Sequence, residues 1–108
     1  MMLASQRRLA ARSARIAYGT DCGMYPFSHG NLEYQAMVAA WLSLARALQA
    51  ATGNAAELLG HDDICVLETC AIADIVAMPG DPIADVTATT KVDLVVTDGR
   101  VRRQPEHP

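Results

Sequence analysis

Apolar side chains in the middle of the chain recur at the spacing of an α-helix. They form one stripe between positions 44 and 59, made of Leu44, Leu48, Ala51, Ala55 and Leu58. Because residues three or four apart share a helix face, the stripe predicts a helix with one side turned toward a core. Ser43 can cap its first turn, and Gly60 suits the left-handed position that ends a helix.

Two more helices are expected before this one. Asn31 can cap a helix that runs to about residue 42. Its apolar contacts would be Met37, Val38, Trp41 and Leu42. Residues 3–14 read as a short helix whose arginines lie away from its apolar side. The central part of the chain is therefore expected to be helical.

After the polar connector at residues 61–63, the pattern changes to that of β-strands. Aliphatic and β-branched runs at residues 64–67, 73–78 and 92–97 predict three strands. The sequence Pro-Gly-Asp-Pro at residues 79–82 predicts a turn. Asp98-Gly99 is a strong signal for a two-residue hairpin. This strand-rich end favours an antiparallel sheet.

A different pattern stands near the N-terminus. Residues 16–18 are a short apolar run that ends in the glycine-flanked residues 19–23. This pattern is typical of a buried strand that leads into a loop, which would continue to Gly30. Since one strand cannot make a sheet, its neighbours must lie in other sequence or in another chain.

Asp21 is the candidate catalytic residue in this pattern. It directly follows the expected strand and lies between Gly19 and Gly23. In barrels and open α/β sheets, catalytic side chains gather at the carboxyl ends of strands. A carboxylate there could bind a metal, accept a proton from water or orient a substrate amine. From the residues alone, the alternative is a loop aspartate that caps its own turn.

Composition limits the partners and the core. The 108 residues are 51% hydrophobic and carry a formal charge of −3, so the chain lacks the basic surface expected of a nucleic-acid binder. The longest uncharged stretch, residues 34–45, is too short to span a membrane.

Aromatic residues make up only 5%, and alanine buries little area. The chain is therefore poorly equipped to fold alone.

Cysteines and histidines give no second site. Cys22, Cys65 and Cys70 have no paired spacing, which favours reduced thiols in the cytoplasm. The histidines are His29, His61 and His107, in an expected loop, a connector and the tail. Because a catalytic zinc needs about three protein ligands, Asp21 alone does not make a metal site.

Four stretches of the sequence carry a family resemblance. Residues 16–23 read IAYGTDCG, and residues 46–60 read RALQAATGNAAELLG. Residues 73–82 read ADIVAMPGDP, and residues 92–101 follow with the hairpin. In order, these segments resemble the last barrel strand, the next helix and the C-terminal β-sandwich strands of the metal-dependent amidohydrolase superfamily. The nearest subgroup is the imidazolonepropionase-like and Xaa-Pro dipeptidase-like enzymes.

The resemblance implies an eight-stranded barrel that holds one or two divalent metals. Of the family's ligands, only the last-strand aspartate has a counterpart here, Asp21, whose implied role is metal ligand and proton acceptor for the attacking water. Gly23, Met24, Tyr25 and His29 would border the substrate pocket. The metal, zinc in the expected case, would be held by the complete enzyme only, and none is expected for the isolated chain.

The chain departs from this family at turn positions. Trp41 stands where the family usually has glycine, and Leu44 where it favours proline. Thr69-Cys70 stands where the family typically reads Pro-Gly. A non-glycine residue in a left-handed position costs on the order of 1 kcal/mol. These changes indicate relaxed constraint, as in a decaying gene fragment.

The expected fold is α/β. Residues 1–60 would form the last helix–strand–helix portion of a (β/α)8 amidohydrolase barrel, residues 61–103 the C-terminal β-sandwich strands, and residues 104–108 a frayed tail. The expected function is that of the C-terminal part of a cytoplasmic, metal-dependent hydrolase of amide, cyclic amide or dipeptide bonds. Open strand edges would permit self-association. The alternatives are a non-catalytic orphan fragment and a small α+β binding module.

Overall fold

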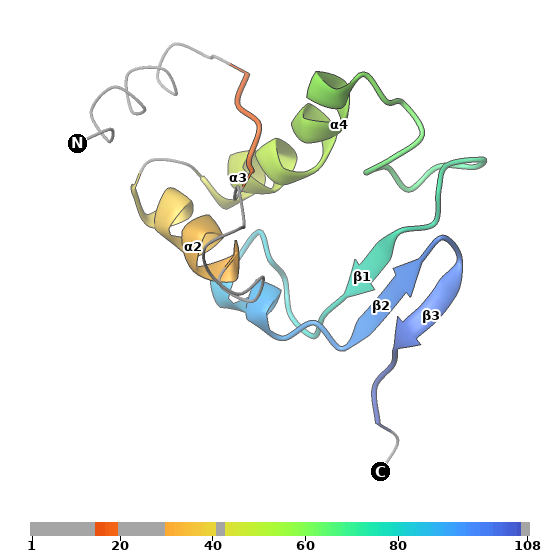
Figure 1. Cartoon of the computed structure of the whole chain (residues 1–108). Coiled ribbons are helices and arrows are strands. Elements are labelled where there is room, and N and C mark those ends of the chain that lie inside the picture. The colour runs from red at the N-terminus through yellow and green to blue at the C-terminus, as the bar shows by residue number, and fades with distance from the viewer. Residues whose placement is uncertain (1–14, 20–29, 41–42, 107–108) are drawn as a thin grey trace.

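A computed structural model describes residues 15–19, 30–40 and 43–106 of the chain. The elements are α2 (Gly30–Ala40), α3 (Leu44–Ala51), α4 (Gly53–Leu59), β1 (Ile75–Ala77), the 3₁₀ helix η2 (Val86–Thr90), β2 (Leu94–Thr97) and β3 (Arg100–Arg103). Helices occupy the first half and a small sheet the second, with η2 lying beside α2 (Figure 1). The helix expected at residues 3–14 lies outside the described residues.

The predicted ends at Ser43 and Gly60 are confirmed, whereas the predicted cap at Asn31 is wrong, because α2 begins at Gly30 and Asn31 lies inside it. The Ser43 Oγ accepts a hydrogen bond from the Arg46 N–H at 3.3 Å and caps α3. Gly60 ends α4 in the left-handed conformation, with φ of 75°. The single helix predicted over residues 44–59 is nevertheless divided in two at Thr52, whose φ and ψ are −121° and −93°. Gly53, a poor helix former, follows this break.

The apolar stripe predicted on this helix is correct only in part, since Ala51 packs against the core but the fully buried positions are others. The buried residues are Ala47 and Ala50 on α3 and Ala56 on α4, whereas Leu58 is 77% exposed. Small side chains are needed at Ala47 and Ala50 because residues 15–19 pack closely there, and the Tyr18 N–H donates to the Ala50 carbonyl. Leucine at these positions would hold the backbone away.

The sheet is antiparallel, with strand order β1-β2-β3. Ile75 pairs with Val96, and Val96 pairs in turn with Val101. The predicted hairpin is confirmed: Asp98 and Gly99 both have positive φ, 48° and 74°, as a two-residue turn of the primed type requires. The strand predicted at residues 73–78 is confirmed in the shorter form of β1.

Two predicted strands do not form. Residues 64–67 contain only bends, because Cys65 has a φ of 59°, which an extended strand cannot accommodate. Residues 16–18 pair with no strand of the described part of the chain. They instead form hydrogen bonds to the α3–α4 helices. The sequence pattern indicated a buried strand, but a strand also requires a partner strand.

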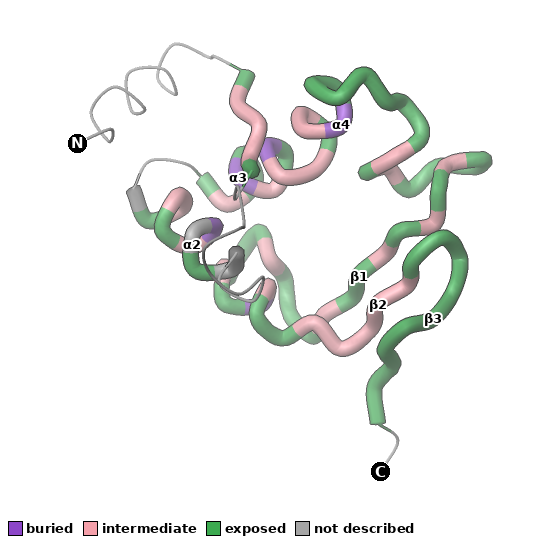
Figure 2. Tube along the Cα trace, in the orientation of Figure 1, coloured by how far each residue is buried: buried purple, intermediate pink, exposed green. Residues whose placement is uncertain are grey.

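The core is small and lies between α2, α3 and η2. Its centre is Tyr34 and Ala47, against which Met37 and Val38 of α2 pack as predicted. Ile16, Tyr18, Ala51 and Val86 complete the cluster. Most of the remaining described surface is exposed or intermediate (Figure 2). Among the described residues, no helix is both long and apolar enough to cross a membrane.

Candidate functional site

The predicted site residues fall in one segment that lies outside the described residues. Asp21, Gly23, Met24, Tyr25 and His29 all belong to residues 20–29. The structure describes the chain on both sides of this segment, namely residues 15–19 before it and α2 after it. What the structure tells about the candidate site therefore comes from the geometry of these two flanks.

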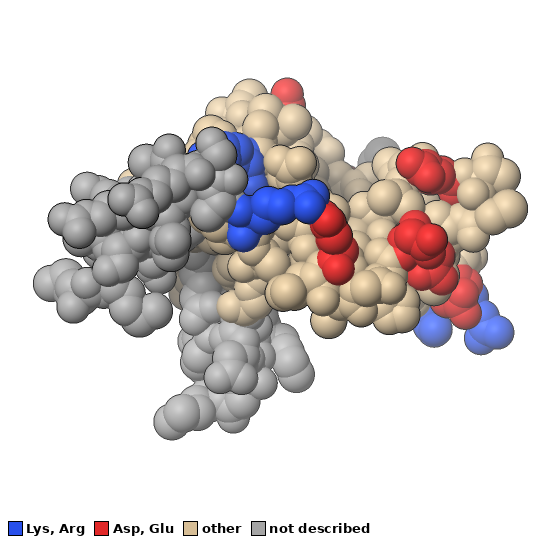
Figure 3. Space-filling view, turned by 90° about the horizontal axis from the view of Figure 1, so that it is seen from above, with Lys and Arg blue, Asp and Glu red and all other residues tan. Residues whose placement is uncertain are grey.

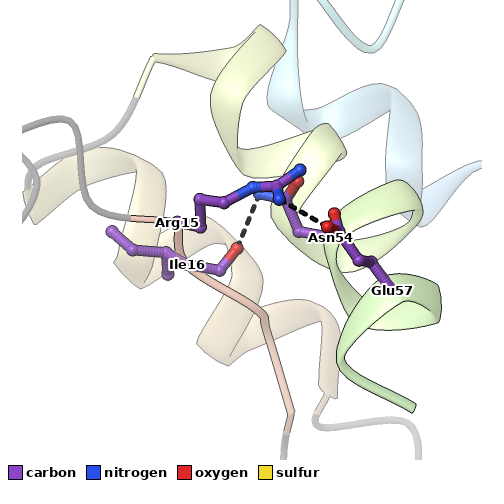
Figure 4. Close-up of polar contacts among 4 residues, drawn as sticks. All are labelled: Arg15, Ile16, Asn54 and Glu57. Carbon is purple, nitrogen blue, oxygen red and sulfur yellow. Dashed lines mark hydrogen bonds and ion pairs between the residues drawn. The ribbon is translucent and has the colours of Figure 1, made fainter. Parts of the chain in front are cut away.

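Polar contacts hold the upstream flank, residues 15–19, to the helices. The Asn54 Nδ2 donates to the Ile16 carbonyl at 2.9 Å, and the Tyr18 N–H donates to the Ala50 carbonyl at 2.9 Å. The Arg15 Nη1 forms an ion pair with the Glu57 Oε1 (Figure 4). Both charged side chains are more than half exposed, so this pair contributes at most about 1 kcal/mol. The two backbone contacts therefore do most of the anchoring.

A shallow cavity of about 250 Å³ lies along this flank. It is lined by Arg15, Ile16, Ala17, Asn54, Glu57 and Leu58. Its opposite charges, Arg15 and Glu57, are already paired with each other. On the face seen in Figure 3, the acidic side chains lie in separate groups and build no single charged patch. The described part of this cavity offers no concentrated charge that would hold an ionic ligand.

The downstream flank is anchored by Tyr34, which stands on α2 shortly after the candidate segment. Only 6% of this residue is exposed. Its ring meets that of Tyr18 edge to face, with centroids 5.8 Å apart and planes at 80°. Within the described part of the chain, its hydroxyl has no hydrogen-bond partner. Burial raises the pKa of the Tyr34 hydroxyl, so the group stays neutral at ordinary pH.

The described titratable residues do not form a metal site. In residues 15–19, 30–40 and 43–106, no three His, Cys, Asp or Glu side chains gather where they could hold a metal ion. His61 is exposed, and its Nδ1 lies 3.6 Å from the Asp63 Oδ1. Cys65 and Cys70 are exposed free thiols. Cys22 and His107 lie outside the described residues.

Sequence reasoning missed the residues that hold the two flanks, namely Arg15, Tyr34, Asn54 and Glu57. Asn54 gave the clearest available signal, because a short polar side chain next to Gly53 inside a helical pattern is unfavourable unless it has a partner. Tyr34 gave no such signal, since an aromatic residue on an apolar helix face is ordinary. Its contact with Tyr18 depends on the fold.

Solved structures resemble this chain over nearly its whole length. A Xaa-Pro dipeptidase with methionine bound in its active site is 30% identical, with a TM-score of 0.86 over 94% of this chain. A prolidase-like protein of Bifidobacterium longum is 31% identical, with a TM-score of 0.86 over 99%. A prolidase in complex with N-methylphosphonate-L-proline is 23% identical, with a TM-score of 0.83 over 94%, which shows the fold alone.

This chain spans only about a quarter of those proteins, namely 25%, 28% and 26% of their respective lengths. A search of curated protein sequences finds no match. The sequence profile of the amidohydrolase family, in contrast, matches residues 2–102. Such a match covers nearly the whole chain and agrees with the structural likeness. The chain therefore belongs to the amidohydrolase family.

Proposed function

We propose that this chain is the C-terminal part of a metal-dependent hydrolase that acts on carbon–nitrogen bonds. The observation that carries the proposal is the continuous likeness of 94% of the chain to one quarter of a Xaa-Pro dipeptidase, at a TM-score of 0.86. Residues 1–60 would contribute the end of a (β/α)8 barrel and residues 61–103 the strands of a β-sandwich, with residues 104–108 as a tail. The substrate would be an amide, a cyclic amide or a dipeptide.

Asp21 is the residue to which we assign the chemistry. Its carboxylate would contribute one oxygen ligand to a divalent metal and accept the proton of the attacking water. The metal, zinc in the expected case, would supply Lewis-acid polarisation of the scissile carbonyl. Gly23, Met24, Tyr25 and His29 would border the substrate pocket. The anchoring of residues 15–18 to α3 and α4 supports this role, because a ligand must project from a fixed backbone.

Most of the metal's ligands would come from sequence other than this chain. A catalytic zinc needs about three protein ligands, and the described residues hold no group of three. We expect the isolated chain to bind no zinc tightly and to hydrolyse no dipeptide. Elemental analysis of the purified chain tests this expectation. Stoichiometric zinc that disappears on Asp21→Ala would contradict it.

Co-expression tests the hydrolase proposal directly. The chain is produced together with the part of the matched Xaa-Pro dipeptidase that lies outside the matched quarter, and hydrolysis of a Xaa-Pro dipeptide is followed. We expect activity with the unchanged chain and a loss of at least about 100-fold with Asp21→Asn. Asp62→Asn is the matched control, because Asp62 is an exposed carboxylate of the connector.

The dipeptidase's own quarter serves as the positive control in that experiment. If its own quarter restores hydrolysis and this chain does not, the hydrolase proposal is wrong. Equal activity with Asp21→Asn and with the unchanged chain would refute the role assigned to Asp21 while leaving the family assignment intact.

A non-catalytic orphan fragment is the second candidate, and the backbone at Cys70 favours it. The family resemblance places glycine there, and the structure shows a φ of 71°, a left-handed conformation held by a residue with a Cβ. The DNA upstream of residue 1 separates the two candidates. An HxH strand and further histidine strands encoded there support the hydrolase, and their absence supports the orphan fragment.

A further inference from the structure

Two adjoining cavities along α4 and the residues that follow it form one groove with an apolar lining. The first, of about 410 Å³, extends from Gly53 to Val66, and the second, of about 240 Å³, extends from Val66 to Ile75. Because they share Val66, they lie end to end on the path from α4 to β1 (Figure 1). We call them the α4 groove, whose larger apolar lining residues are Ile64, Val66, Leu67, Ile72 and Ile75.

We propose that the α4 groove binds the part of the hydrolase that lies outside this chain. This inference rests on the proposed function, which assigns most of the enzyme to other sequence. The lining is open to solvent, since Leu67 is 82% exposed and Ile72 is 39% exposed. One exposed leucine is ordinary on a protein surface, whereas a continuous apolar surface marks a binding site.

The backbone that carries this lining is held in place by its own hydrogen bonds. The Ile72 N–H donates to the Asp63 carbonyl at 2.8 Å and closes the base of the loop that contains Leu67. The His61 N–H donates to the Ala56 carbonyl at 3.0 Å and fixes the exit of the loop from α4. A surface that is already formed loses less conformational freedom when a partner binds. The groove is therefore prepared for an occupant.

The occupant that we infer is the remainder of the same enzyme. The Xaa-Pro dipeptidase shares the backbone of 94% of this chain, but the shared part is only 25% of that protein. The corresponding share of the prolidase-like protein of Bifidobacterium longum is 28%. About three quarters of such an enzyme is therefore available to cover the groove, and the hydrophobic effect favours that contact.

The charges along the groove indicate what the occupant carries. The carboxylates of Glu57, Asp62 and Glu68 line it. Glu57 is already paired with Arg15, which lies in the neighbouring cavity. Asp62 and Glu68 stand beside apolar residues at opposite ends of the groove. An apolar segment flanked by lysine or arginine complements this arrangement.

Photo-crosslinking in the co-expressed pair of the preceding section identifies the occupant. The photoreactive amino acid p-benzoylphenylalanine replaces Leu67, a change that disturbs no buried contact because Leu67 is 82% exposed. We expect mass spectrometry to find it joined to an apolar segment of the dipeptidase part that has lysine or arginine beside it. The same replacement at Ile83, which is 53% exposed and lies outside the helices and strands, is the matched control and should give little of this product.

An affinity tag on this chain measures how strongly the groove contributes to assembly. Leu67→Glu is expected to lower the amount of dipeptidase part recovered with the tagged chain at least about tenfold, as loss of an interface anchor does. Leu67→Met keeps the apolar volume and should restore recovery. Ile83→Glu should change recovery less than about twofold. Glu68→Gln should lower it up to about fivefold, in line with an exposed ion pair.

The outcomes separate this inference from the proposed function. A pair that assembles without crosslinking at position 67, or with a crosslink there to a second copy of this chain, would overturn the inference. Equal losses from Leu67→Glu and Ile83→Glu would do the same. If the crosslink forms as expected but the pair hydrolyses no dipeptide, the inference stands and the hydrolase proposal fails. Hydrolysis by a pair in which Leu67→Glu changes nothing leaves the hydrolase proposal intact and refutes the groove.

Discussion

Cys70 holds a backbone conformation that suits glycine better than cysteine. Its φ of 71° lies in the left-handed region, where the Cβ of an L-residue crowds the following carbonyl oxygen. We expect Cys70→Gly to raise the free energy of unfolding by about 1 kcal/mol, measured by urea denaturation under reducing conditions. Cys70→Ala is the control, since it removes the thiol and keeps the Cβ. A similar gain from Cys70→Ala would show that the thiol, rather than the backbone, is responsible.

The buried hydroxyl of Tyr34 leads to a prediction about stability. No partner for it lies in the described part of the chain, and a buried hydroxyl without a hydrogen bond costs about 1–3 kcal/mol. We expect Tyr34→Phe to raise the free energy of unfolding by about 1 kcal/mol at neutral pH. Urea denaturation provides the measurement. A loss of stability would show that the hydroxyl is hydrogen-bonded.

The same hydroxyl predicts a dependence on alkaline pH. Burial raises the pKa of Tyr34 above its value in the unfolded chain. The stability that follows from keeping this proton is fully present below the unfolded-state value of about 10, and it is lost as pH rises through the folded-state pKa. The unfolding free energy of the unchanged chain should therefore fall relative to Tyr34→Phe above about pH 10. Parallel pH profiles of the two proteins would contradict this.

At the scale of elements, the first turn of α3 is prepared for proline. Ser43 is the N-cap, with φ of −66° and ψ of 155°, the extended conformation that a residue before proline prefers. Leu44 is the first helical residue, where proline loses no helical hydrogen bond. We expect Leu44→Pro to exceed Leu44→Ala in unfolding free energy by about 0.4–1 kcal/mol, measured by thermal and urea denaturation.

Leu48→Pro provides the contrast within the same helix. Leu48 lies in the interior of α3, and its carbonyl accepts a hydrogen bond from the Thr52 Oγ1 at 2.7 Å. A proline there should cost about 3 kcal/mol or more. Equal effects at positions 44 and 48 would show that Leu44 is not the first residue of the helix.

At the scale of the whole molecule, the core is too small to hide the apolar surface. The buried hydrophobic residues among those described are Tyr34, Ala47, Ala50, Ala56 and Ala88, so four of the five are alanines.

The two edges of the sheet also differ in character. The edge strand β3 carries Arg100, Arg102 and Arg103, charges that oppose pairing with another edge, whereas β1 is Ile-Val-Ala. Self-association is therefore expected through β1.

A lysine on β1 tests this expectation. Val76 lies on β1 and is 55% exposed, so Val76→Lys puts a charge on the edge without disturbing a buried side chain. We expect the unchanged chain to form oligomers as its concentration rises, and Val76→Lys to shift it toward monomer in analytical ultracentrifugation. Ile83→Lys is the control, because Ile83 is 53% exposed but lies outside the strands. If the unchanged chain stays monomeric at all concentrations, self-association through the edge of β1 is refuted.

The family assignment and several local structures could be predicted from the sequence. The cap at Ser43, the left-handed Gly60 and the Asp98-Gly99 hairpin depend on residues a few positions apart, and all three are confirmed. The anchors of the candidate segment could not be predicted in this way. Asn54 meets Ile16, and Tyr34 meets Tyr18, only because the fold brings distant residues together.

Local sequence by itself determined the cap at Ser43, the left-handed Gly60 and the Asp98-Gly99 hairpin, because backbone conformation there depends on nearest neighbours and on the presence of a Cβ. Tertiary structure alone decided which face of α3 is buried, since residues 15–19 pack closely over Ala47 and Ala50. It also decided that residues 16–18 bind to helices, because a strand forms only where a second strand supplies the missing hydrogen bonds.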